Sequence, residues 1–123
     1  GRGQIACLKF VEGEGGGELV ERWVIDQRTL NHLALIGPPE ARMLVSTDAP
    51  GAVMGLFTGN LDYDEQVVWR SADTGEELAR SDVLPAMFNG GPVTPGFYGT
   101  LFYLGLDGVI HELSTAGPNP VCE

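Results

Sequence analysis

Short apolar segments, broken by glycine and proline, set the pattern of this chain. Three of them, residues 5–11, 52–58 and 109–115, resemble one another in the order of their apolar positions, and each ends near a glycine. Short apolar or alternating runs bounded by turn residues are typical of β-strands. We therefore predict a strand at each of the three positions.

The flanking residues extend the second and third segments into hairpins. Residues 43–48 precede the second segment, and residues 101–107 precede the third. The Asp-Gly pair at 107–108 is a strong hairpin signal, because both residue types tolerate positive φ. Further candidate strands lie ahead of these hairpins at 32–36 and 87–94.

Two tryptophans indicate a longer repeat. Trp23 lies in a predicted strand at 18–26 and Trp69 in another at 66–73. Their separation matches one propeller blade, which takes roughly 40–50 residues. We interpret the chain as successive four-stranded units, with about two units and part of a third.

Two glycine-containing segments are predicted to be turns. Residues 13–17 lack the Lys-Ser/Thr ending of a phosphate-binding loop, so they are predicted to form a flexible hairpin tip. Residues 74–84 fit either a short helix or a hairpin that turns at 73–75, and we favour the hairpin.

Three motifs in the second half of the chain occur in a familiar order. They are VVWRSADTGEEL at 67–78, PVTPG at 92–96 and GTLFYLGLDG at 99–108. Residues 66–113 as a whole resemble the repeat of PQQ-type quinoprotein β-propellers. The chain departs from that pattern at Ser71, where the family's motif has Asp, and in having one tryptophan per unit, shifted along the repeat.

The predicted fold is all-β and antiparallel, a single domain or propeller segment over 1–123. Propeller-like blades are the first interpretation, and a small β-sandwich or barrel is the alternative. The chain is too short to close a ring, which takes about four blades or more. Stacked repeats bury their apolar faces only against neighbours. We therefore expect other protein chains, in a homo-oligomer or a larger assembly, to complete the fold.

The charge balance narrows the range of partners. A formal net charge of -10 repels phosphate backbones, so we expect no nucleic acid. The sequence contains no apolar run of the roughly 20 residues that span a bilayer.

The two cysteines, Cys7 and Cys122, lie near the two ends of the chain. A bridge between them would place the protein in an oxidising compartment, extracellular or periplasmic. Two free thiols, or a bridge to another chain, remain the alternatives.

Asn60, Asp62, Asp64 and Glu65 form an acidic segment with oxygen donors at near-alternating positions. Such donors suit calcium, although Glu65 occupies the place of the glycine in an EF-hand loop. A solvated connector is the alternative interpretation. We expect no other cofactor.

Phe97 and Tyr98 are candidates for a surface that binds a sugar or a protein partner, with Tyr98 the more exposed because it lies close to glycines. No catalytic grouping is recognisable. The function predicted first is a non-enzymatic extracellular scaffold or binding module, completed by strand or blade pairing with other chains. The first alternative, which the resemblance implies, is a segment of a quinoprotein-like dehydrogenase with PQQ and calcium at a site shared with further blades. The second alternative is a carbohydrate-binding β-domain.

Overall fold

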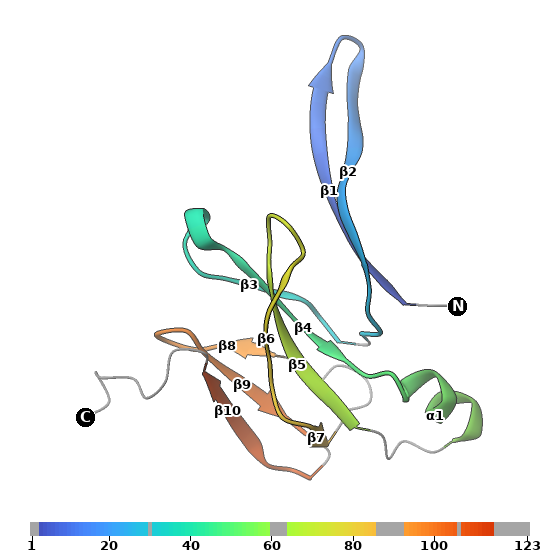
Figure 1. The fold of residues 1–123 in the computed structure, drawn as a ribbon, viewed down its shortest axis with the longest axis vertical. Helices are drawn as coiled ribbons and strands as arrows, with labels where there is room; N and C mark the ends of the chain where they lie inside the picture. The colour runs from blue at the N-terminus through green and yellow to red at the C-terminus, as the bar shows by residue number, and fades with distance from the viewer. Residues whose placement is uncertain (1–2, 30, 60–63, 86–92, 106, 115–123) are drawn as a thin grey trace.

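The computed structural model describes residues 3–29, 31–59, 64–85, 93–105 and 107–114. Antiparallel strands make up most of these residues, so the predicted all-β class is confirmed. Figure 1 shows one long hairpin that projects away from a body of shorter strands. None of the helices in the described ranges is long and apolar enough to cross a membrane.

The projecting hairpin, which we call the arm, consists of β1 (Gln4–Gly13) and β2 (Gly16–Asp26). Within the described residues the two strands pair only with each other. Gly15 and Gly16 both have positive φ, which confirms the prediction of a glycine-rich hairpin tip. The register shifts between Cys7 and Leu8, so that Arg22 bulges out of the pairing.

The larger sheet of the body has the order β3-β4-β5-β6, and a short seventh strand pairs with the beginning of β5. A 3-10 turn at Pro39–Ala41 joins β3 to β4. Gly75, with a φ of 75°, lies in the turn between β5 and β6 and confirms the hairpin predicted there. The strands are β3 (Ala34–Ile36), β4 (Met43–Asp48), β5 (Asp64–Ser71), β6 (Glu77–Arg80) and β7 (Leu84–Pro85).

The smaller sheet of the body has the order β10-β9-β8, built from β8 (Thr94–Pro95), β9 (Thr100–Leu104) and β10 (Ile110–Ser114). Gly108 adopts a φ of 73° between β9 and β10, as the predicted Asp-Gly turn requires. Most of the strand predicted at 87–94 lies outside the described residues, and Thr94 belongs to β8.

The core lies between the two sheets of the body. Val45, Val67 and Trp69 come from the larger sheet, and Leu101 and Tyr103 come from the smaller one. Alternation along each strand directs these side chains to one face of each sheet. Two sheets that share one apolar layer are compatible with the small sandwich predicted as the alternative fold.

The predicted repeat is wrong at its second segment. Residues 52–58 form the helix α1 (Ala52–Thr58), which ends at Gly59 in the left-handed conformation. Both edges of β4 are already paired, with β3 and with β5, so the sheet leaves no place beside β4 for another strand. A short apolar run fits either a buried strand or a helix, and here the glycine cap and the filled sheet select the helix.

The tryptophans do not occupy equivalent positions either. Trp23 is partly exposed at the base of the arm, whereas Trp69 is buried between the sheets of the body. The propeller arrangement is therefore not confirmed, because its two marker residues and its three matching segments lie in different settings.

Candidate protein-binding surface

The arm exposes nearly its whole length. Ile5 is the only residue of β1 and β2 that is buried, and all the rest are exposed or partly exposed. A two-stranded hairpin without further cover is marginally stable in water. The strands form because they pair with each other, but the arm lacks the apolar contacts that bury a strand in the body.

One face of the arm carries a patch that we call the Phe10 face, made of Leu8, Phe10 and Leu19. Phe10 pairs directly with Leu19 across the strands, and Leu8 points to the same side two residues earlier. Their exposed fractions are 51%, 59% and 64%, high values for three adjoining large apolar side chains. Contiguous exposed apolar residues of this kind mark interaction sites.

Gly17 gives the Phe10 ring its position. A Cβ atom on Gly17 would lie 2.1 Å from the Cζ atom of Phe10, so the ring lies flat across the ribbon above this glycine. The ring therefore adds a broad apolar surface to the arm.

The opposite face of the arm is mixed. Val11 pairs with Glu18, and Val20 pairs with Lys9, which places two valines and two charges together. Both valines are exposed. Both faces of the arm thus expose apolar side chains, but only on the Phe10 face do they form a continuous patch.

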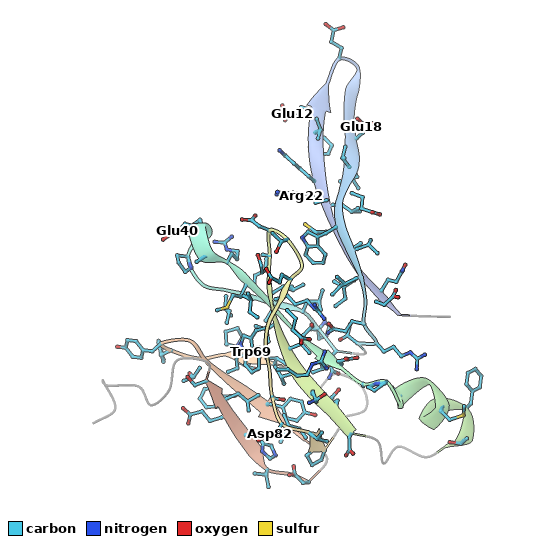
Figure 2. The ribbon with its side chains drawn as sticks, viewed as in Figure 1. Glu12, Glu18, Arg22, Glu40, Trp69 and Asp82 are labelled. Atoms are coloured by element: carbon cyan, nitrogen blue, oxygen red, sulfur yellow. The ribbon has the colours of Figure 1, made fainter. Side chains whose placement is uncertain are left out.

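Carboxylates surround the outer half of the arm. Glu12, Glu14, Glu18 and Glu21 have no ion pair or side-chain hydrogen bond with any described residue. Figure 2 shows Glu12 and Glu18 on the outer half, with Arg22 nearer the base. Arg22 lies 3.9 Å from Asp73 of the body. The outer half therefore presents apolar side chains within a negative rim.

The base of the arm is held by specific contacts to the body. The indole Nε1 of Trp23 donates to the carbonyl oxygen of Ala72 over 3.1 Å. Gly75 approaches the same indole so closely that a Cβ atom there would lie 2.8 Å from the ring. Arg70 donates to Gln27 just after β2, which fixes where the chain leaves the arm.

An apolar groove of about 320 Å³ lies between the arm and the body. Four successive residues of β1, Ile5 to Leu8, line one side together with Trp23 of β2. Leu33 and Leu35, next to and within the edge strand β3, line the other side. The charged residue in the lining is Arg42.

Most of the predicted calcium segment lies outside the described residues, since residues 60–63 are not among them. Asp64 is exposed, whereas Glu65 is buried and accepts hydrogen bonds from Tyr103 and from Asn31. No group of three metal-ligating side chains occurs within the part of the chain that the structure describes. The calcium site stays a prediction.

The hydrogen bonds around Glu65 belong to a buried polar network that sequence reasoning did not find. Asn31 Nδ2 also donates to Thr47 over 3.1 Å, and Tyr103 contacts the carbonyl oxygen of Pro85 over 2.7 Å. The signal in the sequence was Glu65, a glutamate next to the apolar strand residues of β5, which could have indicated a buried carboxyl group. This network joins β4, β5, β9 and the segment before β3.

The other predicted site residues are Phe97, Tyr98 and the two cysteines, and of these Cys7 belongs to the arm. Phe97 and Tyr98 are both exposed in the turn between β8 and β9, with ring centroids 6.4 Å apart. The exposure predicted for Tyr98 is confirmed, but Phe97 is the more exposed of the two, at 85% against 64%. Cys7 lines the groove at the arm base, whereas Cys122 lies outside the described residues, so their bridge stays a prediction. The sequence analysis identified the hairpin tip but missed the Phe10 face. Residues 8 and 10 before the glycines and residue 19 after them fall on one face of a hairpin, and this alternation could have indicated the patch.

Comparisons with known proteins identify no relatives. No family model, no curated protein and no solved structure matches the chain.

Proposed function

We propose that the protein is a non-enzymatic binding module that docks on another protein chain through its arm. The observation that supports this proposal is the solitary two-stranded arm with large apolar side chains exposed on both faces. An uncovered ribbon of this kind gains burial and backbone pairing when another chain contacts it.

The body favours the same role. β3 and β10 are edge strands of their sheets within the described residues, so strand pairing with a neighbour is available there too. The arm remains the better candidate because it combines a free edge with a continuous apolar face. The extracellular location and the bridge from Cys7 to Cys122 remain further parts of this proposal.

A carbohydrate-binding role is a second candidate, favoured by the exposed Phe97 and Tyr98 rings. Aromatic faces stack on apolar sugar faces, and Tyr98 is held with a φ of 57° in a tight turn. The Phe10 face contains three large exposed apolar side chains and belongs to a two-stranded ribbon with free edges, so protein binding has the stronger support.

Site-specific photo-crosslinking tests the proposed function. A photoreactive amino acid replaces Leu19 on the arm or, as a control, Met54 on α1, which is exposed to a similar extent at 68%. Each protein is irradiated alone and in an extract of its source cells, and products are identified by mass spectrometry. We expect a discrete protein partner at position 19, lost in the double variant Leu8→Ser, Phe10→Ser. Equal labelling from positions 19 and 54 would contradict the proposal.

A further inference from the structure

We propose that the arm binds an extended protein segment with an apolar half, seated in the groove at the arm base, and a basic half, beside the outer carboxylates. This inference rests on the proposed function and adds the chemistry of the partner. It is carried by the apolar groove at the arm base and by the four glutamates on the outer half of the arm.

The groove defines the apolar half. One wall is formed by β1, which pairs with β2 along one edge only, and contains Ile5 and Leu8. The other wall contains Leu33 and the face of the larger sheet on which Leu35 pairs with Leu44. A segment in the extended conformation can pair with β1 along its other edge and place alternate side chains among these residues. Leu33 and Leu35 are themselves exposed, so they lose water-accessible surface when the segment binds.

Charge separates the two halves. Arg42 lines the groove and repels a cation there, which favours apolar residues in the part of the segment next to it. Farther along the arm, Glu12, Glu14, Glu18 and Glu21 outnumber the single cation Lys9, and none of the four forms an ion pair with a described residue. Lys or Arg side chains on the bound segment are therefore expected beside the outer arm and not in the groove.

The same charges argue against a second copy of this chain as the occupant. Apposed arms would bring the carboxylates of two rims together, and the whole chain carries a net charge of -10. Like charges apposed across an interface disfavour a partner, whereas opposite charges speed association. A basic segment from a different protein is thus the better complement.

Three synthetic peptides of twelve residues, acetylated and amidated, test this inference with the whole protein. The first has an apolar half of Val, Leu and Thr and a half in which Lys alternates with Thr. The second has Glu in place of Lys, and the third has the same composition as the first but with Lys distributed along its length. Binding is measured by isothermal titration calorimetry at two salt concentrations.

We expect the first peptide to bind at least about tenfold more tightly than the other two, with affinity falling as salt rises. The double variant Glu12→Lys, Glu18→Lys should weaken binding about tenfold, and Leu35→Asp should weaken it to a similar extent. The control variants are Glu40→Lys, another exposed glutamate, and Phe57→Ser, an apolar residue 87% exposed on α1. Both controls should change the affinity less than about twofold.

Binding of the first and second peptides with equal affinity would overturn the charge assignment. The apolar assignment would be overturned if Leu35→Asp had no effect, and absence of binding by the first peptide would overturn the whole inference. The crosslinking experiment keeps the proposed function separate. If position 19 captured a second copy of this chain or an acidic surface, the arm would still be a binding element and the proposed function would stand. The inference of a basic segment would then be overturned.

Discussion

The arm and the body use strands in opposite ways. β1 and β2, with 10 and 11 residues, are longer than any described strand of the body, yet they bury a single side chain. β4 has six residues and buries four of them. Long, fully paired strands are therefore not necessarily buried strands in this protein, and we expect the stability of each region to follow its burial.

The polar groups differ in the same way. The body encloses Glu65 with Tyr103 and Asn31, so its buried carboxyl group has hydrogen-bond donors from two other elements. The arm leaves its glutamates in solvent around an apolar face. Burying a polar group costs free energy unless it is hydrogen-bonded, whereas exposed charges stay available for a partner.

The largest expected difference between the regions is the cost of removing a leucine. Leu101 is fully buried, so Leu101→Ala should lower the free energy of unfolding by about 2–5 kcal/mol. Leu19 is exposed, so Leu19→Ala should change it by less than about 0.5 kcal/mol. Urea unfolding of both variants measures this difference. Similar costs would show that the arm is buried in solution, by self-association or by folding onto the body.

The buried polar network provides the second test. Tyr103→Phe removes a hydroxyl group that contacts Glu65 and the carbonyl oxygen of Pro85, at nearly constant shape. We expect a loss of about 1–3 kcal/mol in the free energy of unfolding, because buried polar groups lose a partner. Tyr98→Phe, at an exposed tyrosine, is the matched control and should have almost no effect. Equal effects from both substitutions would mean that the network contributes nothing.

The third test concerns the contacts that hold the arm base to the body, where we expect a smaller effect. Trp23→Phe removes the hydrogen bond to Ala72 but keeps an aromatic ring at the arm base. We expect a loss of about 0.5–1.5 kcal/mol in the free energy of opening the arm base. Amide hydrogen exchange should accelerate at residues 23–26 and stay unchanged in β4. Acceleration in both places would show that the arm and the body open together.

The smallest effect concerns pH. The backbone N–H of Val109 and the ring of His111 both bond to Asp107 and hold the pKa of its carboxyl group below 3.8, its ordinary value. A lowered folded-state pKa stabilises the turn above the unfolded-state pKa, and this contribution is lost as pH falls through the lower, folded-state value. An NMR titration of Asp107 should therefore show a midpoint below 3.8. In the Asp107→Asn variant the turn should lose its response to acid in this range. A midpoint at the ordinary value of 3.8 in the parent protein would contradict the proposed hydrogen bonds to Asp107.

Residue order alone determined the β class, the positions of most strands and the three hairpin turns near residues 15, 75 and 108. These features depend on local alternation and on glycines that accept positive φ, and both can be read from neighbouring residues. The charged and apolar residues of the candidate surface were also present in the sequence, though without an indication of which would be covered.

Tertiary structure decided the rest. Residues 52–58 became a helix because β4 already had two neighbours, a fact that depends on pairing between distant segments. The same long-range pairing buried Trp69 and left Trp23 on the arm, although their local patterns are alike. Local sequence specifies which face of a strand is apolar, but only the packing of the whole chain determines whether that face meets the core or remains open to a partner.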